Sequence, residues 1–273
     1  MRGRFMSLQQ VQNSFPTYCL YRFNNNIKTE EGSEYPLNLK YSSRTSSTDT
    51  LEYLDSEIGE EFGKCIYIRG GYDQTHVILN ASRNYNDYIE EFINLINGDF
   101  TLELFGKFYF NDDHYTILSI MIGVEPGDDK YNNNESSIRL MLGESGYIGS
   151  KYYYDLAELY ARIGYIDENY GYMPRAIASP RNVRISESNY HFCLVKINTY
   201  LRFYIDGKIK YQLDLGTNKL YINENSKPDK LFSIYGLADS GHMLLDELII
   251  SRGAKYTSDF TPPSSPSTVI PKS

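Results

Sequence analysis

Short runs of β-favouring residues recur along most of the chain, separated by clusters of glycine, asparagine and aspartate. The runs read YCLYRF, KCIYIR, THVIL, FTLELFGKFYF, YTILSIMIGV, SIRLML, FCLVKI, LRFYI, KIKYQLDL, LFSIYGL and LLDELIIS. Runs of strand length between turn-forming residues are typical of an all-β protein. The pattern therefore predicts an antiparallel two-sheet β-sandwich.

Two segments show this pattern most clearly. In FTLELFGKFYF, Phe100, Leu102 and Leu104 fall on one face of the expected strand, so that face is predicted to be core. In LRFYIDGKIKYQL, Asp206 and Gly207 separate two apolar runs, which favours a two-residue type I′ hairpin.

One short helix is expected among the strands, over residues 86–98 (NDYIEEFINLING). Its apolar residues recur at helical spacing, namely Ile89, Phe92, Ile93 and Ile96. Asp87 and Glu90 have the spacing of a capping box, and Gly98 suits the helix end. We expect this helix to cover one end of the sandwich.

The chain divides into an N-terminal arm (residues 1–15), one domain (residues 16–263) and a Pro/Ser-rich tail (residues 264–273). No internal repeat and no Gly- or Pro-rich linker divides the middle part. Residues 145–182 mix helical and strand-like spacing, so we interpret them as a long excursion between strands.

Composition excludes some classes of function. The net charge is -8 and the pI is near 5.1, which argues against nucleic acid as a partner because that binding needs clustered Lys and Arg. No apolar run has the length of a signal peptide or a membrane span, so we expect a soluble protein made in the cytosol, with no membrane partner. Cys19, Cys65 and Cys193 lie in strand-like stretches, where buried free thiols are expected rather than disulfides.

Several segments occur in a familiar order: TYCLYRFNN, GKCIYIRGGYDQTHVIL, GDFTLELFGKFYF, YHFCLVKINTYLRFYIDGK and LLDELIISRGAKYTSDFTPPSSP. In these segments the chain resembles the concanavalin A-like lectin and glucanase superfamily, in particular the laminin G-like variant of bacteriophage tail and capsid appendage proteins. The resemblance covers residues 16–263. Leu104, Phe105 and Gly106 stand where that family often has a tryptophan, so we expect altered packing in the same fold.

The resemblance implies a concanavalin A-like jelly roll and a non-enzymatic structural protein of a bacteriophage virion. The chain would be a capsid decoration or tail appendage exposed outside the particle, with weak affinity for host glycans as an added hypothesis. Its partners would be other virion proteins, contacted through residues 1–15, and further copies of the chain. The alternatives are a secreted or cell-surface lectin and a divergent glycosidase; the fold alone does not choose between them.

The sequence contains no clear motif for catalysis. A glycosidase of this fold would need two carboxylates on one face, and no Glu-x-Asp-x-Glu run is present. Asp246 and Glu247 are adjacent, so in a regular strand they would point to opposite faces, and the resemblance makes them structural. The four histidines (His76, His114, His191 and His242) are scattered and carry no nucleophile or zinc motif. No cofactor is expected, calcium being the one metal to consider.

Calcium prefers oxygen ligands gathered in loops. The candidate ligands fall in two polar segments and are Asn111, Asp112 and Asp113, then Asp128, Asp129, Asn132 and Glu135. The same residues also suit solvated turns without any metal, so both interpretations stay open.

The chain has 27 tyrosines, 13 phenylalanines and no tryptophan. This bias suits strands and polar aromatic surfaces, although an AT-rich genome would produce it as well. One tyrosine-rich segment also contains the carboxylate and amide groups that hold sugar hydroxyls, and we predict it as a glycan-binding site: Tyr152, Tyr153, Tyr154, Tyr165, Asp167, Asn169, Tyr170 and Tyr172. The alternative is that these tyrosines pack on the sandwich or on a neighbouring subunit.

Overall fold

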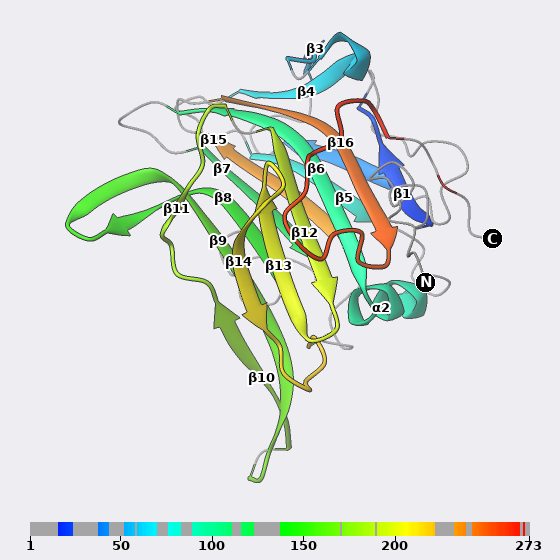
Figure 1. The fold of residues 1–273 in the computed structure, drawn as a ribbon, viewed down its shortest axis with the longest axis vertical. Helices are drawn as coiled ribbons and strands as arrows, with labels where there is room; N and C mark the ends of the chain where they lie inside the picture. Colours follow the sequence, from blue (N-terminus) through cyan, green and yellow to red (C-terminus); the bar gives the residue numbers. More distant parts are fainter. Residues whose placement is uncertain are drawn as a thin grey trace, which may run out of the picture.

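Two antiparallel β-sheets pack face to face, with one short helix at one end (Figure 1). The computed structural model describes residues 16–23, 38–43, 52–57, 59–69, 76–82, 89–110, 116–122, 137–169, 171–188, 190–221, 232–238, 242–267 and 270. The predicted all-β jelly-roll sandwich is confirmed. The arm, residues 1–15, lies outside the described residues.

The first sheet has the strand order β14 (Lys208–Asp214), β13 (Tyr200–Ile205), β12 (His191–Ile197), β6 (Phe100–Tyr109), β16 (His242–Arg252), β4 (Lys64–Arg69) and β3 (Glu52–Asp55). Strand β1 (Thr17–Tyr21) also pairs with β16. The second sheet has the order β10 (Gly171–Ala178), β9 (Lys151–Asp167), β8 (Ile138–Ile148), β7 (Thr116–Ile122), β15 (Phe232–Ala238), β5 (His76–Ser82) and β2 (Asn38–Ser43), and β11 (Val183–Arg184) pairs with β9.

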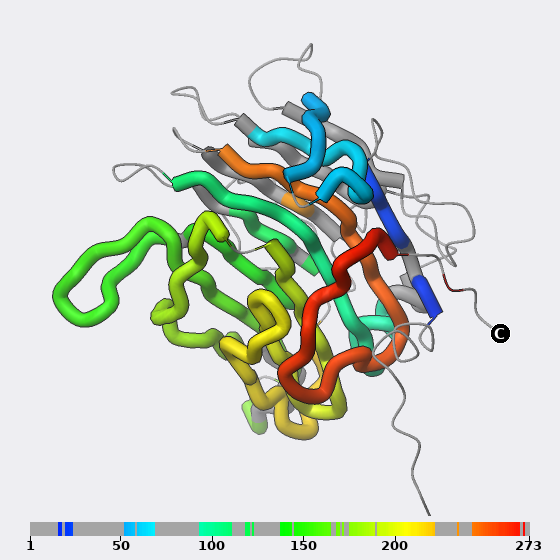
Figure 2. The backbone as a smooth tube through the Cα atoms, turned by 45° about the horizontal axis from the view of Figure 1, so that its top comes forward, coloured from blue at the N-terminus to red at the C-terminus, as the bar shows by residue number. Residues whose placement is uncertain are grey.

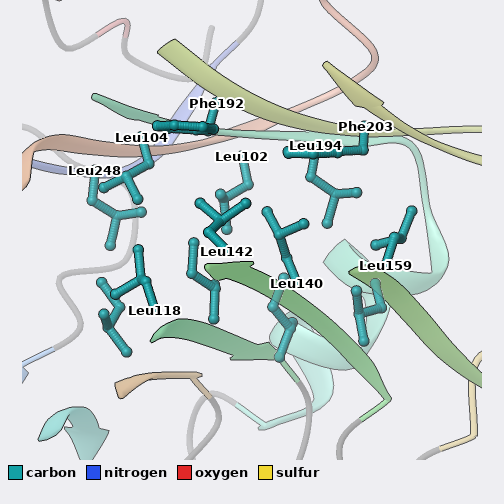
Figure 3. Close-up of a cluster of buried hydrophobic side chains, with 14 of the residues drawn as sticks. Leu102, Leu104, Leu118, Leu140, Leu142, Leu159, Phe192, Leu194, Phe203 and Leu248 are labelled. Atoms are coloured by element: carbon teal, nitrogen blue, oxygen red, sulfur yellow. The ribbon is translucent and has the colours of Figure 1, made fainter. Parts of the chain in front are cut away.

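The core lies between the sheets and is made of alternate residues from each strand. Leucines and phenylalanines from the first sheet point toward leucines of the second (Figure 3). Leu102 and Leu104 of β6 meet Leu140 and Leu142 of β8 across this layer, and none of the four is more than 1% exposed. Each such leucine contributes roughly 1.5–3 kcal/mol by leaving water.

The local predictions agree with the structure. Asp206 and Gly207 form the turn between β13 and β14 with φ angles of 47° and 72°, as a type I′ turn requires. The helix, α2 (Ile89–Asn97), buries Leu95 and Ile96. Its predicted N-terminal capping residue Asp87 lies outside the described residues.

The end of α2 is held by a lysine from another element. The Lys196 ammonium of β12 donates to the carbonyls of Asn97 (2.8 Å) and Gly98 (3.0 Å), and burial lowers the pKa of this lysine. A cation at a helix C-terminus satisfies carbonyls that the helix leaves without partners.

Residues 145–182 are not an excursion, and that interpretation was wrong. They form the end of β8, the 17-residue strand β9 and strand β10, which extend the second sheet. Ala157, Leu159 and Ala161 alternate toward the core, whereas the intervening positions are polar or tyrosine. The outward tyrosines concealed this period of two, because a tyrosine counts as apolar in a sequence pattern.

The outer face of the first sheet is partly covered by the segment that follows β16, residues 253–263. Figure 2 shows this segment in red, running back across the sheet. Its Phe260 N–H donates to the Gly207 carbonyl at 2.9 Å, and a Cβ on Gly207 would lie 2.0 Å from the Phe260 oxygen. Gly207 is therefore needed both for the turn and for this close approach.

The cover explains why the second face of β6 is also buried. Thr101, Glu103 and Phe105, which alternate with the core leucines, are at most 2% exposed. Of the three cysteines, Cys65 and Cys193 are buried free thiols, as predicted, and burial raises the pKa of Cys65 to about 12. The side chain of Cys19 lies outside the described part.

The predicted tail also contacts the sandwich where it is described. Ser267 donates its N–H to the Glu247 carboxylate, and Ile270 and Thr17 exchange two hydrogen bonds of 2.8 and 2.9 Å. Among the described residues, no helix has the length and apolarity needed to cross a membrane.

Candidate functional site

Strands β8 and β9 continue beyond the sheet as a hairpin that projects from the sandwich (Figure 1). Two register shifts interrupt the pairing, between Leu142 and Glu144 and between Glu144 and Gly146. Gly143, with a φ of 84°, supplies the left-handed conformation at the first shift. Such bulges bend and twist a strand pair, so they set the direction in which this hairpin leaves the sheet.

Three tyrosines form an aromatic array on the hairpin. Tyr147 lies opposite Tyr152 in the pairing, and their ring centroids are 4.7 Å apart at 71°. Tyr154 adds a ring 5.0 Å from Tyr152 at 78°. Tyr147 is 67% exposed and Tyr152 is 39% exposed. Large aromatic surfaces are therefore open to solvent at this tip.

A second tyrosine contact ties the hairpin to β11. Tyr153 has the Arg184 guanidinium 4.6 Å from its ring centroid and the Lys151 ammonium at 5.3 Å. Arg184 Nε also donates to both Asp155 oxygens, at 3.1 and 2.9 Å, and this hydrogen bonding raises the pKa of Arg184. The hairpin thus combines exposed aromatic rings with cations and a carboxylate whose positions are fixed by one another.

The structure does not gather all the predicted glycan-binding residues in one place. Tyr152, Tyr153 and Tyr154 lie at one end of β9, whereas Asp167 pairs with Gly171 at its other end. A strand rises about 3.3 Å per residue, so the ends of this 17-residue strand lie roughly 50 Å apart along the chain. These residues therefore do not form one continuous site, and their role in glycan binding stays a prediction.

The remaining predicted residues belong to the far end. Asn169 is exposed in the turn between β9 and β10, and Tyr170 lies outside the described residues. The strands include Tyr165, Asp167 and Tyr172, but their side chains are not described. Conversely, sequence reasoning missed Tyr147, although its distance of five residues from Tyr152 around Gly149 is what a hairpin turn would produce.

The predicted calcium ligands cannot be placed. Asp112, Asp113, Asp128 and Asp129 all lie outside the described residues, as do Asn111, Asn132 and Glu135. Within the described ranges, no three His, Cys, Asp or Glu side chains are grouped to hold a metal ion. Calcium binding stays a prediction.

Asp246 and Glu247 do not follow the simple strand alternation. The pairing of β16 with β6 shifts between Asp246 and Leu248, and Glu247 has a φ of 29°, so Glu247 is the extra residue of a β-bulge. On its other edge β16 pairs with β4 up to Leu245 and with β1 from Leu248. The two acids therefore lie where one partner strand ends and the next begins.

Both carboxyls are closed to a substrate, at 0% and 1% exposure. Glu247 accepts the Ser267 N–H at 3.1 Å with either oxygen and lies 3.8 Å from Arg22 Nε. Asp246 accepts the Glu247 N–H at 2.8 Å. Burial raises the pKa of Asp246 to about 6 and that of Glu247 to about 7.

Another buried carboxylate lies on the outer face of β6, beneath the segment 253–263. Glu103 accepts hydrogen bonds from Lys255 Nζ (2.6 Å) and the Tyr256 hydroxyl (2.9 Å), and His191 Nε2 lies 3.4 Å away. Burial acts to raise the pKa of Glu103, but the Lys255 charge and the His191 contact outweigh it and hold that pKa well below its usual value. This network attaches the covering segment to the sheet.

No protein-family model matches the chain, and no curated protein matches its sequence. Among solved structures, the binding domain of botulinum neurotoxin serotype D/C aligns with a TM-score of 0.52 and 12% identity, over 89% of this chain and 50% of that one. A structure of botulinum neurotoxin type C, whose cell entry is described as dependent on two ganglioside molecules, gives 0.51 and 12%, over 91% and 50%.

A third solved structure is domain 4 of AbnA, an extracellular GH43 arabinanase from Geobacillus stearothermophilus in complex with arabinotriose. It gives a TM-score of 0.47 and 15% identity, over 88% of this chain and 94% of that one. The chain spans half the length of the neurotoxin chains that it matches. The likeness to the two neurotoxin structures shows the fold, a jelly-roll sandwich.

Proposed function

We propose that this chain is a non-catalytic carbohydrate-binding domain that contacts its glycan with the β8–β9 hairpin. The observation that carries the proposal is the exposed array of Tyr147, Tyr152 and Tyr154. Sugars present flat C–H faces that stack on aromatic rings, and their hydroxyls pair with neighbouring polar groups. Arg184 of the adjoining strand β11, which pairs with Asp155 of β9, is such a polar group.

The state of the four carboxyl groups described above supports a role without catalysis. Retaining and inverting glycosidases need two carboxyls facing one another across an open groove. Asp246, Glu247 and Glu103 are buried under other parts of the chain, and Asp155 is engaged by Arg184. Hydrolysis of a chromogenic glycoside panel by the purified protein would contradict this part of the proposal.

The fold also supports glycan as the ligand class. Botulinum neurotoxin type C, which has a similar fold, is described as interacting with gangliosides, and gangliosides carry an oligosaccharide. Because the sequence identity is only 12%, the hairpin residues of this chain, and not those of the toxin, carry the argument.

The biological setting that we propose is a bacteriophage virion, where the chain would serve as a capsid decoration or tail appendage anchored through residues 1–15. The virion setting rests on the sequence resemblance to phage appendage proteins, and the anchoring role rests on the basic arm with Arg2 and Arg4 beside a single domain. Mass spectrometry of purified particles should detect the chain, and a variant without residues 1–15 should be missing from them. Normal incorporation of that variant would refute the anchoring role, and a chain found only in the culture medium would favour a secreted lectin.

The glycan site is tested by binding to a printed panel of oligosaccharides. We expect Tyr147→Ala and Tyr152→Ala each to weaken binding to the captured glycan about tenfold, because each removes a stacking ring. Tyr200→Ala, a half-buried tyrosine on β13 far along the chain from the hairpin, is the matched control and should bind as the wild type does. Unchanged binding by both hairpin variants would overturn the assignment of this site.

A further inference from the structure

A second group of aromatic and charged side chains lies on the outer face of the first sheet, beyond the segment 253–263. In the pairing, Leu244 of β16 lies opposite both Tyr67 of β4 and Lys107 of β6, and His242 lies opposite Tyr109. Positions two residues apart in a strand share a face. Tyr67, Lys107, Tyr109 and His242 therefore share one face across three neighbouring strands.

The rings of this group form a continuous surface. Tyr109 and His242 stack with their centroids 4.1 Å apart at 20°, and Tyr67 lies 5.5 Å from His242 at 60°. All three are half-buried, so part of each ring is exposed to solvent. Because the stacked rings cover one face of each other, what this pair offers to a ligand is mainly the exposed apolar ring edges.

A carboxylate beside the rings is held in one orientation. Glu57, which follows β3, accepts hydrogen bonds at Oε2 from Lys107 Nζ (2.6 Å) and from the Tyr109 hydroxyl. Lys107 in turn lies 4.8 Å from the Tyr109 ring and 5.8 Å from the Tyr190 ring. The Glu57 side chain is 49% exposed, and the hydrogen bonds from Lys107 and Tyr109 are both accepted at Oε2 rather than at Oε1.

The charges of this group balance. The hydrogen bonds from Lys107 and Tyr109 lower the pKa of Glu57, and the same bond to Glu57 raises the pKa of Lys107. Glu57 is therefore ionised and Lys107 protonated at neutral pH, so the pair has no net charge. Such a pair does not favour an acidic ligand, but it offers a strong acceptor to a hydroxyl.

We infer that Glu57, Lys107, Tyr109, Tyr67 and His242 form a second glycan-binding site, specific for a neutral sugar. The C–H groups of the sugar pack on the exposed ring edges of Tyr109 and His242, and a hydroxyl donates to Glu57 Oε1. The inference shares with the proposed function the idea that the ligand is a glycan, but it uses another surface and other residues. The two can therefore fail separately.

The test is Glu57→Gln, which keeps the shape of the side chain and removes its charge. Because a hydrogen bond to a charged acceptor is lost, we expect about tenfold weaker binding to the neutral glycans captured from a printed panel, measured by calorimetry. Glu60→Gln, an exposed glutamate in the neighbouring 3-10 turn (Glu60–Phe62), is the control and should bind normally. A denaturation curve for each variant confirms that it is folded.

The outcomes separate the two sites. Weakened binding by Glu57→Gln with normal binding by both Tyr147→Ala and Tyr152→Ala supports this site and overturns the hairpin site. The reverse result supports the hairpin site and overturns this one. Capture of acidic glycans only, with Glu57→Gln unchanged, also overturns it, and a wild-type protein that captures no glycan overturns both.

Discussion

Two lysine–carboxylate pairs lie on the outer face of the first sheet, and only one of them is covered. In both pairs the lysine Nζ lies 2.6 Å from a carboxylate oxygen: Lys255 with Glu103, and Lys107 with Glu57. The side chains of the first pair are 7% and 1% exposed, whereas those of the second are 19% and 49% exposed. Strand β6 contributes one member of each, at positions 103 and 107.

The difference shows that burial, and not the ion pair itself, decides what each pair does. Glu103 is ionised although it is buried. Its charged form therefore depends on Lys255 and on the segment 253–263 for stabilisation. Glu57 stays in contact with water, which screens its attraction to Lys107. The buried pair Lys255–Glu103 therefore stabilises the fold, and the exposed pair Lys107–Glu57 is accessible to a ligand.

The largest effect should come from breaking the covered pair. In Lys255→Met the Glu103 carboxyl stays buried without its cation, so the free energy of unfolding should fall by about 3–5 kcal/mol in urea denaturation. Lys107→Met, the same change at the open pair, should cost less than about 1 kcal/mol. Equal losses in the two variants would contradict the role given to burial.

A buried carboxyl pair without a lysine sharpens the comparison. Burial raises the pKa of Asp246 to about 6 and that of Glu247 to about 7, so the folded state binds more protons than the unfolded state between their ordinary values and these. The contribution of this carboxyl pair to the free energy of unfolding is therefore greatest at low pH, and it is lost as pH rises through about 6 to 7.

Between about pH 5 and pH 8 Glu103 stays ionised, and the free energy of unfolding should fall by about 3 kcal/mol as the two acids ionise. The double variant Asp246→Asn, Glu247→Gln should flatten this slope in denaturation curves recorded across the range. A slope that persists in the double variant would assign the effect to other groups.

Weakening the contact between the segment 253–263 and the first sheet should have a smaller effect on the free energy of unfolding. Gly207→Ala places a Cβ against the Phe260 carbonyl and also strains a left-handed residue, so we expect a loss of about 2 kcal/mol. Gly149→Ala is the matched control, because Gly149 has a similar φ of 63° and no atom within 4 Å of the added Cβ. It should lose only the conformational part, about 1 kcal/mol. Similar losses would mean that the contact with Phe260 does not matter.

The smallest effect on stability is expected at the open pair. Glu57→Gln should change the free energy of unfolding by less than about 1 kcal/mol, and the change should shrink further in high salt. Thermal unfolding at low and high ionic strength measures both. A loss comparable to that of Lys255→Met would show that Glu57 is structural and would weaken its assignment to a binding site.

The sequence determined the features that depend on neighbours along the chain. Alternating residues in FTLELFGKFYF placed Leu102 and Leu104 in the core, and Asp206-Gly207 specified its turn because few residue pairs accept positive φ at both positions. The helix over residues 89–97 followed from its apolar spacing. The same local logic failed in residues 145–182, where exposed tyrosines concealed the alternation of β9.

The tertiary structure alone decided which polar groups are covered and which tyrosines meet. Glu103 finds Lys255 at a separation of 152 residues, and Tyr147 faces Tyr152 only in the register that the bulges of β8 impose. In the sequence, Asp246 and Glu247 are acidic residues just as Glu57 is. The strands and the tail that surround Asp246 and Glu247 nevertheless bury these two. Burial is a property of everything that packs around a residue, so the local sequence does not contain it.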